Sequence, residues 1–145
     1  MDFFEDAESY NRYFDSIIEK LPKDLVKYYN EQYSGNKPNR FHDCKIRILE
    51  FNGNANIYRK EVDAIRIVLS LGEEIEYDLV FSGIVSSKVK YNSSENFYDV
   101  KYILGEILHC ELGLSKDYIL KFYTSTGFEM FLEFQSVKIK KRIFK

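Results

Sequence analysis

The sequence predicts an α+β fold in which one or two N-terminal helices pack on a mostly antiparallel sheet of about six strands. The first observation behind this prediction is a change of period: apolar residues recur about every 3.6 residues before residue 40 and every second residue after it. The second is that polar, turn-forming segments separate the later apolar runs. With 145 residues, 45% of them hydrophobic, the chain fits a single domain over 1–145, helical over 1–35 and sheet over 40–142.

An apolar stripe at helical spacing opens the chain, and acidic residues fill its first turns, where the helix macrodipole favours carboxylates. Pro22 ends or kinks this helix and suits the first position of a second one. The polar segment 34–39, with its glycine and proline, would end the second helix. The first stripe consists of Phe3, Ala7, Tyr10, Phe14, Ile17 and Leu21, and the second helix would hold Leu25, Val26, Tyr29 and Tyr33.

Alternation of apolar and polar residues predicts most of the strands after residue 40. Asn52-Gly53 predicts a hairpin turn, and residues 72–74 and 125–127 predict two further tight turns. Residues 91–96 (YNSSEN) are typical of a loop. The predicted strands lie near 44–49, 62–71, 75–82, 118–124 and 128–134, and the last continues towards Ile139.

Residues 100–112 are ambiguous, because their apolar spacing fits a helix while their β-branched and aromatic content fits a strand. The neighbouring segments are strands, and a sheet meander is the simplest continuation of the chain. We therefore predict a strand.

The apolar members of the in-phase stripes should form the core. Cys44 and Cys110 are the two cysteines of the chain, and we expect both to be buried and unpaired, as small apolar residues. We expect near-complete burial of Phe14, Ile17, Ile46, Ile67, Leu79 and Leu132.

Charge and composition exclude several classes of protein. The net charge of −2 argues against a dedicated nucleic-acid binder, which carries a basic surplus. Without an apolar run of about 20 residues or a basic region before an apolar stretch, we expect a cytoplasmic protein that does not cross a membrane. Residues 1–35 carry eight acidic and four basic side chains, whereas residues 135–145 carry five basic side chains and no acid. We interpret the basic end as a solvated strand end near the acidic helices.

Two segments hold side chains that could perform chemistry: His42-Asp43-Cys44, and Glu106 to Glu111 with its His109-Cys110 pair. A zinc site of two cysteines and two histidines is chemically conceivable. In a strand, however, His109 and Cys110 point to opposite faces, so the four side chains cannot converge. Phosphate-binding glycine loops and nucleophile motifs are also missing from the sequence. We therefore predict no metal, no cofactor and no enzymatic activity.

Two parts of the chain together resemble a known class of proteins. One is Phe41-His42-Asp43-Cys44-Lys45-Ile46, which opens the sheet directly after the helices. The other is the late run of Leu104–Ile107, Tyr118–Leu120, Phe128–Met130 and Phe134–Ile139. In layout this resembles small uncharacterised proteins of low-GC Gram-positive bacteria, some of which are regarded as immunity proteins of polymorphic toxin systems. The resemblance implies a non-catalytic protein that neutralises a toxin by covering its active surface.

Three functional hypotheses remain. The first is a protein-binding domain whose acidic helical region steers a basic partner such as a toxin, with Glu5, Glu8, Tyr10, Tyr13, Asp15 and Tyr28 as contact residues. The second is a small-ligand or substrate pocket built from His42, Asp43, Glu106 and His109. The third is a subunit whose exposed sheet edge or face forms a homo-oligomer.

Overall fold

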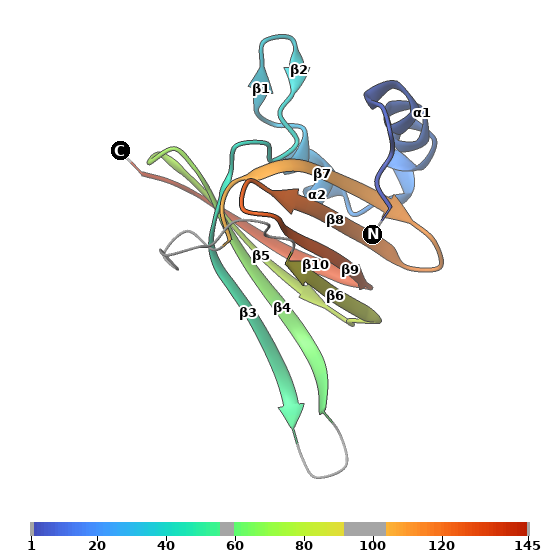
Figure 1. Ribbon diagram of the computed structural model, residues 1–145, viewed down its shortest axis with the longest axis vertical. Helices are drawn as coiled ribbons and strands as arrows, with labels where there is room; N and C mark the ends of the chain where they lie inside the picture. The colour runs from blue at the N-terminus through green and yellow to red at the C-terminus, as the bar shows by residue number, and fades with distance from the viewer. Residues whose placement is uncertain (1, 56–59, 92–103, 145) are drawn as a thin grey trace.

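Two four-stranded antiparallel sheets form the body of the protein, and the helices lie along one side of it (Figure 1). The computed structural model describes residues 2–55, 60–91 and 104–144. The predicted α+β class with a mostly antiparallel sheet is confirmed. Over the described residues the strands number ten rather than about six: the two short strands after the helices and the strand at 86–91 were not predicted, and the last predicted strand is two strands.

The predicted helical stripe forms α1 (Ala7–Ile17), followed by the 3₁₀ turn η1 (Ile18–Lys20). The Asp6 carboxylate caps α1 by accepting a hydrogen bond of 2.7 Å from the Ser9 N–H, and this bond holds the pKa of Asp6 below its ordinary value. Phe3 precedes the helix and Ala7 is exposed, so the first part of the expected stripe does not face the core. The buried stripe consists of Tyr10, Phe14, Ile17 and Leu21.

The second helix is shorter than predicted. α2 covers Lys23–Tyr29, starts directly after Pro22 and stops well before Tyr33. Tyr33 instead belongs to β1 (Tyr33–Ser34), which pairs with β2 (Lys37–Pro38). Gly35 makes the tight turn between them in the left-handed conformation (φ +69°). The helix therefore ends before Tyr33, although the helical spacing of apolar residues continues to that position.

Sheet 1 has the strand order β10-β5-β4-β3, with every neighbouring pair antiparallel. The predicted turn at 72–74 is confirmed, since it joins β4 to β5 and Gly72 takes a positive φ. The strands are β3 (Lys45–Ala55), β4 (Lys60–Leu71), β5 (Ile75–Ser82) and β10 (Ser136–Ile143).

The predicted hairpin turn at Asn52-Gly53 is wrong. Both residues lie inside β3, where Asn52 pairs with Ala64 and Gly53 pairs with Val62 on β4. The pairing register shifts between them, which is the irregularity that a glycine inside a strand permits. Pairing continues to Ala55, so the connection to β4 falls at 56–59, outside the described residues.

Sheet 2 has the strand order β6-β9-β8-β7 and is also antiparallel throughout. The strand preference for 100–112 is confirmed from Ile107 onwards, while 100–103 lie outside the described residues. The predicted turn at 125–127 is confirmed. Of the predicted loop 91–96, Tyr91 ends a strand and the rest lies outside the described residues. The strands are β6 (Ser86–Tyr91), β7 (Ile107–Leu114), β8 (Tyr118–Thr124) and β9 (Phe128–Phe134).

The strand predicted to run from Phe128 towards Ile139 is two strands in two different sheets. β9 ends at Phe134, and β10 begins at Ser136 in sheet 1. Between them, the Gln135 N–H donates to the carbonyl oxygens of Ser82 and Gly83, each at 3.1 Å. The alternation of apolar and polar residues continues from β9 into β10, because the inward-facing residues are apolar in both sheets.

The core lies between the inner faces of the two sheets and beneath the helices. The rings of Phe81 on β5 and Phe134 on β9 meet edge to face with centroids 4.7 Å apart, which places the two sheets in direct contact. All six residues predicted for the core are buried, and none is more than 9% exposed. No helix in the described part of the chain has the length and apolar character needed to cross a membrane.

Candidate functional site

β7 is an edge strand of sheet 2, and its open side faces the helices. An edge strand presents unpaired N–H and C=O groups on alternate residues. The Leu112 N–H donates to the Tyr10 hydroxyl at 2.8 Å, and the Leu114 N–H donates to the Tyr13 hydroxyl at 3.0 Å. The Tyr13 hydroxyl donates in turn to the Leu114 carbonyl oxygen at 3.2 Å. Tyrosine side chains thus take the place of a neighbouring strand along this edge.

Tyr29 of α2 extends the same pattern by donating its hydroxyl proton to the Cys110 carbonyl oxygen at 2.6 Å. Its oxygen lies 2.9 Å from the Tyr10 hydroxyl, and the Tyr10 hydroxyl also lies 3.3 Å from the Leu112 carbonyl oxygen, so the single Tyr10 proton has two acceptors within reach. Burial raises the pKa of both phenols well above the ordinary value, so both stay neutral. The two helices are therefore tied to β7 by hydrogen bonds as well as by apolar packing.

Of the three tyrosines predicted as contact residues of a protein interface, one is buried and two are half-buried. Tyr10 is only 2% exposed, and the half-buried Tyr13 uses its hydroxyl on Leu114. The half-buried ring of Tyr28 packs against Tyr77, with centroids 5.6 Å apart. The assignment of Tyr10 is therefore corrected: helical periodicity placed it on the first helix, but it could not show that the open edge of β7 would take up its hydroxyl.

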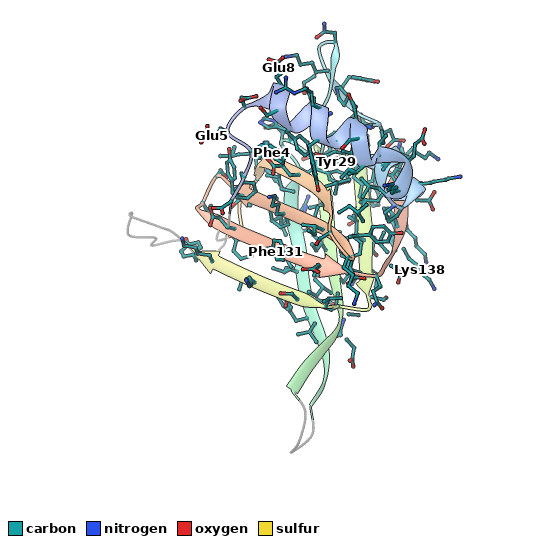
Figure 2. The ribbon with its side chains drawn as sticks, turned by 90° about the vertical axis from the view of Figure 1, so that its right-hand side faces the viewer. Phe4, Glu5, Glu8, Tyr29, Phe131 and Lys138 are labelled. Atoms are coloured by element: carbon teal, nitrogen blue, oxygen red, sulfur yellow. The ribbon has the colours of Figure 1, made fainter. Side chains whose placement is uncertain are left out.

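The predicted acidic contact residues do lie on the outside. Glu5, Glu8 and Asp15 are exposed, and Glu8 forms one loose ion pair with Arg12 at 3.7 Å. Figure 2 shows Phe4 together with Glu5 and Glu8 at the N-terminal end of α1, and the Phe4 side chain is 37% exposed. We call Phe4, Glu5, Glu8 and Asp15 the acidic face.

Beneath the N-terminal segment lies a fully buried carboxylate, Glu111 of β7. Its Oε2 accepts a hydrogen bond from the Phe4 N–H at 3.0 Å and lies 2.6 Å from Nε2 of His109. Its Oε1 has no hydrogen bond among the described residues, but the Lys121 ammonium lies 3.4 Å away and also donates to the Asp2 carbonyl oxygen. Because the buried charge is compensated by these groups, Glu111 fixes the N-terminal segment on the outer side of sheet 2.

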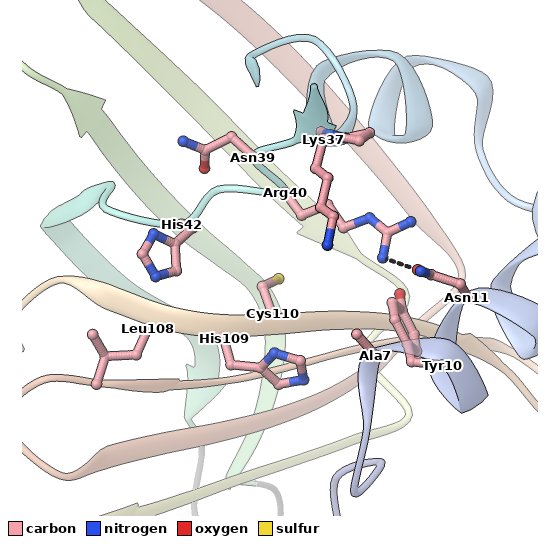
Figure 3. Close-up of a pocket in the computed structure, with 11 residues that line it drawn as sticks. Ala7, Tyr10, Asn11, Lys37, Asn39, Arg40, His42, Leu108, His109 and Cys110 are labelled. Carbon is pink, nitrogen blue, oxygen red and sulfur yellow. Dashed lines mark hydrogen bonds between the residues drawn. The ribbon is translucent and has the colours of Figure 1, made fainter. Parts of the chain in front are cut away.

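A pocket of about 280 Å³ lies between α1, β2 and β7 (Figure 3). Both histidines of the chain line it, His42 from the loop before β3 and His109 from β7. Lys37 and Arg40 line the same pocket. The tertiary structure therefore joins two histidines that are 67 positions apart in the sequence.

The two predicted acidic members of the histidine pocket are placed differently. The Asp43 carboxylate lies beside His42, with Oδ1 at 3.0 Å from Nδ1, and both side chains are about half exposed. Glu106 is not a lining residue: it forms a strand bridge with Lys45, and its N–H donates to the Ser125 hydroxyl at 3.1 Å. Of the four predicted residues, the two histidines line the pocket, and the Asp43 carboxylate contacts His42.

Arg40 is the pocket residue that sequence reasoning missed. Its guanidinium lies over three aromatic rings, at 5.3 Å from the Tyr10 centroid, 5.1 Å from Phe14 and 5.7 Å from Tyr29. It donates to the side-chain oxygen of Asn11 at 2.6 Å, and it has no carboxylate partner among the described residues. A signal was present in the sequence, since Lys37, Arg40 and His42 fall within six positions that contain no acid.

The two thiols are free and buried, as predicted. Burial raises the pKa of Cys44 to about 12 and that of Cys110 well above its ordinary value, so neither is a nucleophile in the folded protein. Within the described residues, no group of three or more histidine, cysteine, aspartate or glutamate side chains could hold a metal ion. No protein-family model matches this chain, and no curated protein sequence matches it.

Proposed function

We propose that this chain is a non-enzymatic protein-binding domain of the bacterial cytoplasm, which occludes a basic protein in the way an immunity protein covers a toxin. The observation that supports this best is that the two sides of α1 have different environments. The inner side of α1 packs on β7 and hydrogen-bonds to it. The outer side of α1 and the segment before it carry exposed carboxylates and the partly exposed ring of Phe4. Such a surface supplies both charge complementarity and an apolar anchor.

The carboxylates of the acidic face are available to a partner. Glu5 and Asp15 form no ion pair with any described residue, and the single pair of Glu8 with Arg12 joins two side chains that are 83% and 73% exposed. Exposed pairs of this kind contribute little to folding, about 0.2–1 kcal/mol. Because the fold gains so little from these charges, their role is better explained by attraction of a basic partner.

Phe4 is suited to act as the apolar anchor of the interface. Its backbone N–H is held by Glu111, and its ring lies 5.1 Å from the Tyr13 ring between centroids. A ring that is ordered before binding loses little conformational entropy on binding. Truncation of such an anchor acts mainly on the dissociation rate, whereas reversal of a rim charge acts on the association rate.

The gene neighbours of this chain supply the test. Each neighbouring gene product is expressed alone and with this chain, and we expect one to be toxic alone and harmless in the presence of the chain. With that product as the probe, the double variant Glu5→Lys/Glu8→Lys should associate about tenfold more slowly at low salt. Its association rate should also depend less on salt concentration.

The matched control is Glu73→Lys/Glu74→Lys, which makes the same charge change in the exposed turn between β4 and β5. It should lower the association rate much less, because that turn is not part of the acidic face. Phe4→Ala should raise the dissociation rate at an unchanged salt dependence. Equal effects of the two double variants, or a toxic neighbour that the chain never neutralises, would refute binding through the acidic face.

A further inference from the structure

We propose that the pocket between α1, β2 and β7 binds a small tetrahedral oxyanion, either inorganic phosphate or the phosphate group of a small ligand. This site is separate from the acidic face and does not depend on the proposed protein partner. Figure 3 shows Lys37, Arg40 and His42 on one side of β7, while the His109 ring lies across the strand from them, and all four residues line the pocket. No aspartate or glutamate is among the residues that line it.

The charge in the pocket is only partly compensated. His42 has the Asp43 carboxylate at 3.0 Å, and His109 has the Glu111 carboxylate at 2.6 Å. Lys37 and Arg40, in contrast, have no acidic partner among the described residues. The pocket therefore holds two cations, Lys37 and Arg40, without a matching anion among the described residues.

Arg40 is positioned as a binding group would be. The three aromatic rings around its guanidinium and the bond to Asn11 leave the side chain little freedom. Arg40 is half-buried, and its Nε is a buried donor without a hydrogen bond among the described residues, although buried polar atoms normally have a partner. The planar, rigid donor set of a guanidinium matches the oxygens of phosphate, and an ordered one pays less entropy on binding.

The loop that carries Arg40 and His42 is held in an unusual conformation. Arg40, Phe41 and Asp43 all take positive φ angles, of 57°, 66° and 68°. The loop is fastened to β7, because the Asp43 N–H donates to the Ile107 carbonyl oxygen at 2.9 Å and the Ile107 N–H donates to Cys44 at 2.8 Å. These bonds hold Arg40 and His42 beside β7, so the pocket is formed before any ligand arrives.

The size of the pocket limits the ligand. A volume of about 280 Å³ is just below the range of roughly 300–1,000 Å³ typical of sites for drug-sized molecules. It suits a phosphate group with a small organic body. Chloride and acetate lack the tetrahedral set of oxygens that an arginine and a lysine could share.

The test is a titration of the ¹⁵N-labelled protein with inorganic phosphate at constant ionic strength, followed by two-dimensional NMR. We expect saturable shifts confined to the amides of residues 37–43 and 108–110. Glycerol phosphate in place of inorganic phosphate distinguishes an organic ligand from a free ion, since the former should bind more tightly if the pocket accepts an organic body. Acetate and chloride should give no saturable shifts.

Arg40→Gln should weaken phosphate binding at least about tenfold, or ~1.4 kcal/mol. Because Arg40 also packs on the helices, Lys37→Ala serves as a second variant: Lys37 is exposed, and its loss should weaken binding severalfold without affecting folding. Lys138→Ala is the matched control, since Lys138 is an exposed cation on β10 outside the pocket, and it should leave the affinity unchanged. An absence of saturable shifts, or equal affinities for the parent, Lys37→Ala and Lys138→Ala proteins, would overturn the proposal.

Discussion

Asp78 on β5 is held by Arg66 on β4 through two hydrogen bonds, of 3.0 and 2.9 Å. Hydrogen bonding to this guanidinium holds the pKa of Asp78 below its ordinary value, although partial burial opposes the shift. A carboxyl whose folded-state pKa is lowered stabilises the fold above its unfolded-state pKa, which is about 3.9. That contribution is lost as the pH falls through the folded-state pKa. The pair is therefore an acid-sensitive connection between two strands of sheet 1.

Asp78→Asn should lower the free energy of unfolding at neutral pH by about 1–2 kcal/mol, because it removes the charge from two bonds to a guanidinium. Below about pH 4 the stability of the variant should fall less steeply than that of the parent. Urea unfolding at a series of pH values measures both effects. Arg66→Gln should flatten the acid limb in the same way, since it removes the same partner. Parallel stability curves for the parent and Asp78→Asn in acid would contradict this account.

At the scale of elements, the edge of β7 is the feature that organises the helical half of the chain. An open edge is a template for pairing with another chain, and a covered edge prevents it. Here the cover is supplied by tyrosine hydroxyls of α1 and α2, which replace strand hydrogen bonds one by one. Gly113 permits the close approach, because a Cβ at that position would lie 3.3 Å from the Tyr13 hydroxyl oxygen.

Tyr13→Phe should cost about 1 kcal/mol of stability, because it leaves the Leu114 N–H without its partner. Native-state hydrogen exchange should accelerate at the Leu114 amide and change little at the Leu112 amide. Tyr10→Phe is the reciprocal control, since it should accelerate Leu112 and leave Leu114 nearly unchanged. A uniform acceleration in both variants would show that the hydroxyls act only through global stability.

At the scale of the whole molecule, the thiols report on the integrity of the core. Cys44 and Cys110 are 1% and 4% exposed, and burial raises the pKa of each. Reaction of either thiol with a disulfide reagent should therefore require an opening of the structure.

In the folded protein both thiols should react at least about a hundredfold more slowly than in denaturant, because the reactive thiolate is suppressed. Ellman titration of freshly purified protein in denaturant without reductant should count two free thiols per chain. The same titration without denaturant is the control for accessibility. Rapid reaction of a thiol in the folded protein, or a count of zero after denaturation, would exclude their assignment as unpaired core residues.

The fold also brings some of the basic residues near the C-terminal end together with acidic residues from other parts of the chain. The interpretation of the basic C-terminal end as lying near acidic helical residues agrees with the ion pair of Lys141 on β10 with Glu31, at 2.7 Å. Arg142 pairs with Glu76 on the neighbouring strand at 3.2 Å. Part of the basic surplus is thus paired inside the fold, whereas Glu5 and Asp15 of the acidic face form no ion pair among the described residues.

The sequence alone determined the class of the fold, the place of both helices and of most long strands, and most of the faces that are buried. Burial of Phe14, Ile67 and Leu132 follows from local periodicity, because a residue's neighbours at three, four or two positions fix which side of its element it occupies. Turns at Gly72 and Gly127 were predictable for the same reason, since the conformation they need is a local property.

Only the tertiary structure decided where the strands divide and what the polar groups do. The step from β9 to β10 is invisible to periodicity, because both inner faces are apolar. The same is true of the candidate sites. Tyr10 is buried because its hydroxyl bonds to the open edge of β7, and Arg40 and His109 line one pocket because the loop before β3 is hydrogen-bonded to that strand. Contacts between residues so far apart in the sequence depend on which edges and surfaces the fold leaves open, and no local pattern encodes that.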